Sequence, residues 1–427
     1  MKFVLACYGT RGDVEPGAAL GRELLSRGHE VRMAVPPNVV DFVESAGLAA
    51  IAYGPDAQTW HDVHQDLVTH VFGKFWKIQD VRALVREDWQ LLTHLWREGT
   101  TKLMPLAEGA DLIITGAIGE ESAANVAEYY GIPLATLHYF PLRPNGSSES
   151  MPLLPTAAAR SAMKVNEWLG WPMMMRFDGA QRRELGLPKA TGPVPRRIAK
   201  RGSMEIQAYD EFCFPGLAAE WAQWNGKRPF VGALTMGLPT DADEEVASWI
   251  AAGTPPIYFG FGSHPVESPA ETLAGISAVC EQLGERALVC AGWSDFSGVS
   301  DAEHVKVVSA VNHSATFPAC RAVVHHGGAG TTAAGLRAGV PTLILSTWVG
   351  DQRLSGGIVK RLKVGSARPL LSTGQDSLLA ELRTILSPDY VARAREVGAR
   401  MTPPAASRAA AARLLEDFAH QKCVADR

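Results

Sequence analysis

The sequence has few cysteines, no long apolar run and no strong excess of charge of either sign. Its six cysteines among 427 residues include no CxxC pair, which argues against a zinc ribbon or a thioredoxin-type motif and predicts reduced thiols in a cytoplasmic protein. No apolar run approaches the roughly 18 residues of a membrane-spanning helix. The net charge of −4 gives no electrostatic reason to expect binding to nucleic acid.

The first residues also lack the apolar segment of a secretory signal. Residues 4–8 are apolar, but Arg11 and Asp13 follow at once, so we interpret this segment as a buried first strand. A metal-binding acidic triad is lacking as well. Asp241 and Asp243 stand two residues apart, but within an acidic run that we interpret as solvated linker surface. We therefore expect no metal site and no resident cofactor.

What the sequence does contain is a repeated alternation of strands and helices. The length predicts two domains, and the composition, 46% hydrophobic and 20% charged, is that of a folded globular protein. Apolar runs predict strands at 1–8, 29–35, 110–115 and 132–139, with helices at 16–28, 39–46 and 121–130. A second series has strands at 257–261, 287–291, 305–311, 322–326 and 340–345, with a helix at 270–283 between the first two strands and closing helices at 377–386, 390–401 and 407–419. The alternation predicts two α/β, Rossmann-like, doubly wound domains.

Two segments, 56–109 and 140–205, interrupt the first series. They are rich in aromatic residues and methionine, among them Trp60, Trp76, Trp96, Trp168 and Met173. One interpretation is ordinary core beneath long helices, and the other is the wall of an apolar pocket, because inserted segments often carry specificity. Residues 215–254, rich in glycine, proline and acids, are predicted to connect the domains.

The strongest chemical signal is a glycine-rich segment that follows a predicted strand and opens a helix. It reads Val323-Val324-His325-His326-Gly327-Gly328-Ala329-Gly330-Thr331-Thr332. Glycines admit a close backbone approach, and the free N–H groups and dipole of a helix N-terminus favour an anion. The spacing of Gly328, Gly330 and Ala333 also matches the dinucleotide fingerprint, with Asp351 further on. The preceding histidine pair is foreign to that fingerprint, so a nicotinamide or flavin enzyme is the less favoured interpretation.

Further residues stand in a recognisable order along the chain. Towards the C-terminus they are Val311-Asn312-His313, Phe317-Pro318, the histidine–glycine segment, Gly339-Val340-Pro341 and Asp351-Gln352. Near the N-terminus they are residues 9–16, 29–32 and 36–37. Together they resemble the nucleotide-sugar glycosyltransferases with the GT-B fold, in particular the actinobacterial branch that glycosylates antibiotics, other natural products and mycobacterial glycolipids. The resemblance covers most of the chain. It departs from the family at Ser346, where a proline is usual, and Asp351 stands one residue late.

The resemblance implies a donor site made from the second half of the chain. His326, with Gly328, Gly330 and Thr331, would contact the diphosphate of a UDP- or dTDP-sugar. Asp351 and Gln352 would bind the sugar hydroxyls. Two further contacts are implied, Ser263 with the phosphates and the backbone of Val311 with the base. The alternatives are a core role for His326, a turn role for Asp351 and a helix cap or turn at Ser263.

The resemblance also implies the catalytic base. In this branch the Asp of the Arg-Gly-Asp turn, here Asp13, takes the proton of the acceptor hydroxyl, while other members use a nearby histidine that this loop lacks. The alternative is that Asp13 only caps the first helix. Contacts with the acceptor are expected from Arg11, Trp76, His138 and Phe140. The alternative for the segment of His138 and Phe140 is plain packing, and Arg11 could instead orient Asp13 or meet a phosphate.

The expected protein is therefore an inverting glycosyltransferase that acts on an apolar natural product or glycolipid without a metal. The resemblance implies a GT-B arrangement of two domains facing a cleft, with an acceptor-binding domain at 1–225, a donor-binding domain at 226–404 and a helix at 405–427 that crosses back to the first. Expected partners are the nucleotide sugar and the acceptor, with peripheral membrane contact if that acceptor is a lipid, in a monomer or weak dimer. Alternatives are an inactive homologue that serves as a binding or activator subunit and a nucleotide-sugar epimerase.

Overall fold

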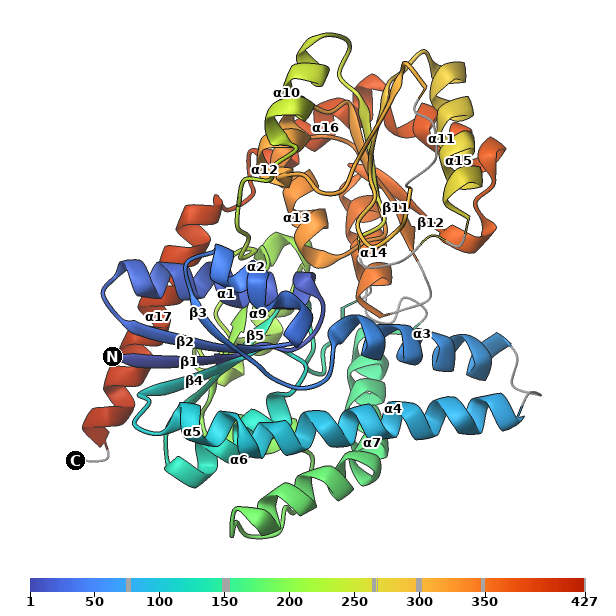
Figure 1. Cartoon of the computed structure of the whole chain (residues 1–427). Coiled ribbons are helices and arrows are strands. Elements are labelled where there is room, and N and C mark those ends of the chain that lie inside the picture. The colour runs from blue at the N-terminus through green and yellow to red at the C-terminus, as the bar shows by residue number, and fades with distance from the viewer. Residues whose placement is uncertain are drawn as a thin grey trace. The chain divides into compact units, whose positions relative to one another are not determined.

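The computed structural model describes residues 1–73, 78–147, 154–262, 266, 268–296, 302–346 and 350–425. The chain divides into two compact units, which are described one at a time (Figure 1). The first contains Met1–Glu211, Pro215–Met236 and Pro404–Arg427, and the second contains Phe212–Phe214 and Gly237–Pro403. The first unit thus continues to Met236, where a boundary at 225 was expected, and it includes the C-terminal segment from Pro404.

The first unit is built on a parallel six-stranded sheet with the order β3-β2-β1-β4-β5-β6. Its strands are β1 (Lys2–Ala6), β2 (Glu30–Val35), β3 (Ala49–Ala52), β4 (Leu112–Thr115), β5 (Leu134–His138) and β6 (Met204–Gln207). Val4 pairs with Arg32 on one side and Ile113 on the other. The four residues from Phe3 to Ala6 are buried, because helices cover both faces of a sheet of this kind.

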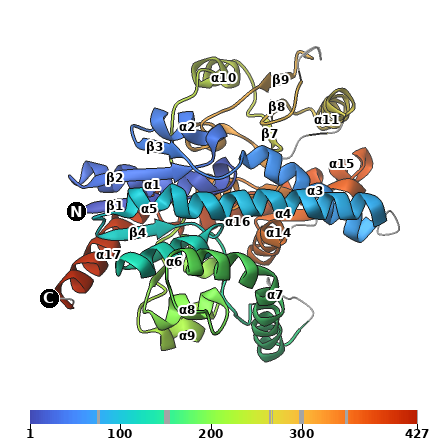
Figure 2. The same cartoon turned by 60° about the horizontal axis from the view of Figure 1, so that its bottom comes forward.

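Helices surround this first sheet. They are α1 (Arg11–Ser26), α2 (Val40–Ser45), α3 (Ala57–Gly73), α4 (Ile78–Thr101), α5 (Leu103–Ala107), α6 (Glu120–Tyr130), α7 (Thr156–Glu184), α8 (Val194–Lys200), α9 (Leu217–Trp221) and α17 (Pro404–Ala425). In Figure 2 α4, α5 and α6 lie in front of the strands, and α4, α6 and α7 contact one another. On α17, Glu416 accepts hydrogen bonds from Arg27 and lies 2.7 Å from His29, which ties this helix to α1 and the loop after it.

The second unit repeats the architecture with the order β12-β11-β10-β7-β8-β9, again parallel. Its strands are β7 (Ile257–Gly260), β8 (Ala287–Cys290), β9 (Val305–Val308), β10 (Ala322–His325), β11 (Thr342–Ser346) and β12 (Gly365–Pro369). Its helices are α10 (Asp243–Ala251), α11 (Pro269–Leu283), α12 (His313–Thr316), α13 (Ala329–Ala338), α14 (Gly350–Leu362), α15 (Gln375–Ile385) and α16 (Pro388–Gly398). Phe259, Val289 and Val324 are buried in the core between sheet and helices.

Most predicted elements are confirmed, and the differences have local causes. Helix α1 begins at Arg11 rather than Pro16, because Thr10 caps it and the proline fits inside the helix. The Arg-Gly-Asp segment, expected as a turn before the helix, is therefore the first turn of α1 itself. Strands β3, β6 and β12 were not predicted. In the part of the chain that the structure describes, no helix is both long and apolar enough to span a membrane.

Candidate functional site

In the second unit, the histidine–glycine segment joins β10 to α13. The first histidine, His325, is buried, and its Nδ1 accepts a hydrogen bond of 3.0 Å from the N–H of Gly327. Burial, helped by the neighbouring His326, lowers the pKa of His325 well below its ordinary value, so the ring is neutral at physiological pH. The role of His325 is therefore structural, because its neutral acceptor nitrogen fixes the turn that follows.

The second histidine, His326, is half-buried and lies between two glycines. A Cβ atom on Gly262 would approach the Cε1 of this ring to 2.4 Å, and one on Gly328 would approach its Nε2 to 2.7 Å. Real Cβ contacts are not that short, so the ring can occupy its place only because both positions are glycine. Gly262 also has a φ of +61°, which favours glycine independently.

The N-terminus of α13 follows immediately. Gly328 is its N-cap, and its carbonyl accepts the first helical hydrogen bond, 2.9 Å from the N–H of Thr332. The N–H groups before Thr332 therefore precede the intrahelical ladder. A Cβ on Gly330 would meet nothing within 4 Å, which shows open space beside this turn. Half-buried Thr331 lies on the same turn. This geometry suits a bound anion.

The start of α14 packs against the same glycine turn. Gly327 has a φ of +103°, and a Cβ there would lie 3.2 Å from the Cα of Gln352 and 3.0 Å from the side chain of Ile344. Gln352 is buried. Burial raises the pKa of neighbouring Asp351, although backbone N–H groups, including that of Gln352, act in the opposite direction. The structure thus brings Asp351 and Gln352, on the first turn of α14, next to the histidine–glycine segment.

Val311 is buried in the core, and the loop that carries it is fixed by Asp243. The carboxylate of Asp243 accepts hydrogen bonds from the N–H of Asn312 at 2.9 Å and from the N–H and hydroxyl of Thr240. Burial acts to raise the pKa of Asp243, but these hydrogen bonds lower it overall. The interpretation of Asp243 as solvated linker surface is therefore wrong, because it clamps the start of α10 to the loop after β9.

Two of the predicted residues fall outside the described residues. Ser263 lies just after Gly262, and Trp76 lies between α3 and α4.

In the first unit, Asp13 occupies the first turn of α1 at the carboxyl end of β1. Its Oδ2 accepts hydrogen bonds from the N–H of Thr10 at 2.8 Å and from the Thr10 hydroxyl at 3.1 Å. Its own carbonyl accepts a hydrogen bond of 2.7 Å from the Tyr139 hydroxyl, which comes from the loop after β5. Gly116 leaves room for that hydroxyl, since a Cβ there would lie 2.7 Å from it. The Asp13 carboxylate is thus held in one place.

The residue Arg11 is exposed and lies beside the same turn. Its guanidinium is 4.5 Å from the centre of the Phe42 ring and 3.7 Å from the carboxylate of Glu15. Burial raises the pKa of Glu15, although a hydrogen bond from the N–H of Met236 and the charge of Arg11 act to lower it. Arg11 is therefore placed by a cation–π contact and a loose ion pair, on the helix turn that carries Asp13.

His138 is fully buried in an ionic network at the end of β5. Its Nε2 lies 3.7 Å from Glu120, and Glu205 is close by. These three residues could hold a metal by type and spacing, since their ligand atoms lie within 4.8 Å of one another. Both carboxylates, however, already accept hydrogen bonds from Arg143, and Glu205 is also paired with Arg228. This burial favours a packing role for His138 over contact with an acceptor.

The aromatic residues of the inserted segments divide into two groups. Trp96 is buried against Phe177, with ring centres 6.0 Å apart, so this part is ordinary core. Phe140 is half-buried. On α7, in contrast, a group of large apolar side chains is exposed, comprising Val165, Trp168, Leu169, Met173 and Met175. The inserted segments therefore provide ordinary core at Trp96 and an exposed apolar surface on α7.

Sequence reasoning missed two features of the first unit. Thr10 was not singled out, although Thr10 and Asp13 have the spacing of a capping box, in which the N-cap and third residues bond reciprocally. The network of Arg143, Glu205 and Arg228 left no local signal, because Arg143 and Glu205 are 62 residues apart.

Comparisons with known proteins find matches in both units. The model of the Glycosyltransferase family 28 N-terminal domain matches residues 3–144, and that of the Erythromycin biosynthesis protein CIII-like, C-terminal domain matches residues 293–423. The chain is 58% identical over 422 residues to an uncharacterized glycosyltransferase of Mycobacterium tuberculosis, with 99% of this chain and 100% of that protein covered. It is 30% identical to the vancomycin aglycone glucosyltransferase of Amycolatopsis orientalis, with 98% and 97% covered.

Solved structures show the same fold at low sequence identity. The glycosyltransferase of kitacinnamycin matches with a TM-score of 0.68 and 17% identity, over 97% of this chain and 98% of the other. The glycosyltransferase SsfS6 of Streptomyces sp. SF2575, solved with thymidine diphosphate, matches with a TM-score of 0.61 and 21% identity, over 98% and 99%.

Proposed function

This chain belongs to the glycosyltransferase family of its mycobacterial relatives and has the GT-B fold, and from that premise we propose that it transfers a sugar from a UDP- or dTDP-sugar to a hydroxyl of an apolar acceptor. The observation that carries the proposal is the position of the His326 ring. Its ring is enclosed by Gly262 and Gly328 beside the open N-terminus of α13. Free N–H groups, a helix dipole and an imidazole together suit a diphosphate.

In this proposal the second unit binds the donor. His326, Thr331 and the first turn of α13 hold the diphosphate and stabilise its charge as it leaves, which is where fixed donors contribute most to rate. Because these groups supply that stabilisation, the reaction has no strict need for a metal. Asp351 and Gln352 lie on the first turn of α14. The Asp351 carboxylate accepts hydrogen bonds from the sugar hydroxyls, and the Gln352 amide both accepts from them and donates to them. The thymidine diphosphate complex of SsfS6 supports a nucleotide of this class.

The base is Asp13 in this proposal. The acceptor oxygen attacks the anomeric carbon from the face opposite the diphosphate, so that configuration inverts, and the Asp13 carboxylate takes the proton. Two hydrogen bonds from Thr10 already hold the Asp13 carboxylate in one orientation. A positioned general base typically raises the reaction rate by about 10²–10⁴-fold.

An apolar acceptor is supported by two observations. Large apolar side chains are exposed on α7, including Trp168, Leu169 and Met173. The 30% identical relative is named as acting on the vancomycin aglycone. Natural-product aglycones and glycolipids are therefore the acceptor classes to test first.

The test is calorimetric binding of UDP, dTDP, GDP and NAD to the purified protein, first without metal and then with Mg²⁺. We expect binding of UDP or dTDP at micromolar Kd without metal, and little change when Mg²⁺ is added. Binding of NAD instead, or of none of these nucleotides, would contradict the donor proposal. The nucleotide that binds then defines the donor for an acceptor screen, in which turnover distinguishes a transferase from an inactive binding homologue.

A further inference from the structure

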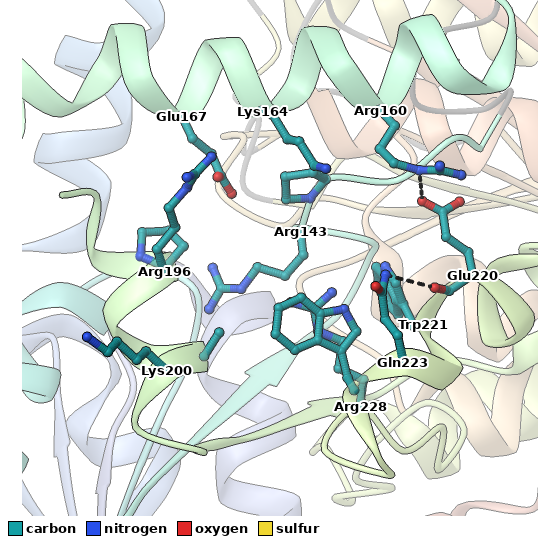
Figure 3. A pocket seen from close by; sticks show the side chains of 14 residues that line it. Arg143, Arg160, Lys164, Glu167, Arg196, Lys200, Glu220, Trp221, Gln223 and Arg228 are labelled. Atoms are coloured by element: carbon teal, nitrogen blue, oxygen red, sulfur yellow. Dashed lines mark hydrogen bonds and ion pairs between the residues drawn. The ribbon is translucent and has the colours of Figure 1, made fainter.

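We propose that the first unit contains a second ligand site, separate from Asp13, that binds a phosphate-bearing molecule. The site is a cavity of about 460 Å³, within the range of small-molecule pockets. It lies among α7, α8, α9 and the short helix η3 (Ala222–Trp224), close to the edge strand β6. Figure 3 shows side chains from these elements pointing toward one another. This inference does not depend on the proposed donor or acceptor.

The charges around the cavity are strongly unbalanced. Six cationic side chains line it, namely Arg143, Arg160, Lys164, Arg196, Lys200 and Arg228, against the two carboxylates of Glu167 and Glu220. Behind the lining, Glu120 and Glu205 add two buried carboxylates that are paired with Arg143 and Arg228. Six cations against these four acids leave an excess of two positive charges.

The excess resides mainly on the side chains that other groups do not neutralise. Arg160 is paired with Glu220. Arg196 stacks on Trp168, with its guanidinium carbon 4.9 Å from the ring centre. Its charge also acts to lower the pKa of Glu167, which burial raises. Within the described part of the chain, neither Lys164 nor Lys200 forms a salt bridge. A phosphate would supply the missing charge, since ammonium and guanidinium groups are its usual partners.

The floor of the cavity is rigid, which separates it from an ordinary basic surface. Arg143 is 3% exposed and Arg228 is 8% exposed, yet both line the cavity. Arg143 donates to Glu120 and Glu205, while Arg228 donates to Glu205 and stacks over Trp224 at 4.2 Å. Both guanidinium groups are therefore held in place before any ligand arrives, so little conformational entropy is lost on binding.

Indole rings form one wall. Trp221 is buried, Trp224 is half-buried, and both line the cavity beside Gln223. A wall of this kind accommodates the non-polar part of a ligand, while cations hold its charged end. The chemistry therefore fits a phosphomonoester with an attached body, which could be a free sugar phosphate or the headgroup of a phospholipid.

The test compares two double variants of the whole protein. In Lys164→Gln with Lys200→Gln, two exposed lysines of the cavity lose their charge. In the control, Lys102→Gln with Lys189→Gln, two exposed lysines of the same unit that do not line the cavity lose the same charge. Calorimetry measures binding of inorganic phosphate, glucose 6-phosphate and glucose, and sedimentation measures binding to phosphatidylcholine vesicles with and without phosphatidic acid. Far-ultraviolet circular dichroism checks that all variants fold.

We expect glucose 6-phosphate or phosphatidic acid vesicles to bind the parent protein and the control, and the cavity variant to bind at least tenfold more weakly. Binding should weaken with salt and survive His326→Ala, which separates it from the donor site. The probe that binds identifies the source of the phosphate. The inference is overturned if neither glucose 6-phosphate nor the phosphatidic acid vesicles bind, if both double variants behave alike, or if His326→Ala removes the binding.

Discussion

The Oδ2 atom of Asp13 accepts two hydrogen bonds from Thr10, one from its N–H at 2.8 Å and one from its hydroxyl at 3.1 Å. One residue thereby serves two purposes. The carboxylate caps the first turn of α1, and the same contact orients it at the carboxyl end of β1, where ligands bind in parallel α/β sheets. The two interpretations that the sequence leaves open, cap and base, are thus compatible.

The substitution Asp13→Asn separates these two purposes. The amide oxygen can still accept from Thr10, so we expect the free energy of unfolding to change by no more than about 1 kcal/mol. An amide cannot take a proton, so turnover should fall about 10²–10⁴-fold while donor affinity is retained. Turnover assays, denaturant unfolding and nucleotide calorimetry measure the three quantities. Exposed Asp41→Asn in α2 is the matched control, and near-normal turnover of Asp13→Asn would remove Asp13 as the base.

The substitution His326→Ala tests whether His326 binds the donor diphosphate. Loss of a hydrogen bond to a charged group should weaken UDP or dTDP binding by roughly 1.5–3 kcal/mol. The control is His304→Ala in the same unit, because His304 precedes β9 and so lies at the amino edge of the sheet, opposite the ends where ligands bind. Calorimetry measures the affinity of both variants for UDP and dTDP. Equal affinities of the two variants would show that His326 does not contact the nucleotide.

The glycines around His326 provide a second test that leaves the histidine in place. At Gly330 a new Cβ meets nothing within 4 Å, so Gly330→Ala should leave thermal stability unchanged or slightly higher. If a diphosphate lies against this turn, the methyl group would intrude on it, and nucleotide affinity should fall at least tenfold. Gly328→Ala should also weaken binding, but by displacing the His326 ring, which the new Cβ would approach to 2.7 Å. A Gly330→Ala protein with unchanged affinity would place the anion elsewhere.

The second unit could largely be predicted from sequence because its signals are local. An apolar run, two histidines and a glycine turn specify β10, the turn and α13, and the structure has them in that order. Strand β12 (Gly365–Pro369) was missed because its small and polar residues lack the apolar run of a central strand, as suits the edge of a sheet.

One error in the first unit arises where distant residues decide the local structure. Strand β6 alternates Met204 and Ile206 with Glu205 and Gln207, a pattern that suggests a half-exposed strand. All four are buried, because Arg143 and Arg228 neutralise Glu205 from elsewhere in the chain. The start of α1 was misplaced for a local reason. Gly12 suggests a turn and Pro16 suggests the first residue of a helix, while the Thr10 cap allows the helix to begin at Arg11.

The network around Glu205 gives a prediction for stability. Glu205→Gln removes the charge that two buried arginines, Arg143 and Arg228, share. Breaking a buried ion pair typically costs about 3–5 kcal/mol, so we expect a large loss in the free energy of unfolding. The control Glu167→Gln changes a half-buried acid that lines the cavity without a salt bridge among the described residues, and it should cost much less. Urea unfolding of both variants measures the difference, and similar midpoints would mean that the network contributes little.

The last prediction concerns the pH dependence of the contact between α17 and the rest of the first unit. Hydrogen bonds from Arg27, with further help from His29, lower the pKa of Glu416 to about 2 from an ordinary value of 4.5. A carboxyl with a depressed folded pKa contributes stability that is fully present above its unfolded value and is lost as pH falls from about 4.5 toward 2. Because the pair is partly exposed, its contribution is limited to about 1 kcal/mol. Glu416→Gln should therefore lower the free energy of unfolding at pH 7 by that amount, and the difference from the parent protein should shrink as the pH falls below about 4.5 and vanish as it approaches 2. Asp417→Asn, an exposed neighbour on the same helix, should not show this convergence. If Glu416→Gln is equally stable at pH 7, the ion pair does not hold α17 in place, and the contact of α17 with α1 together with the burial of Leu415 and Phe418 is sufficient.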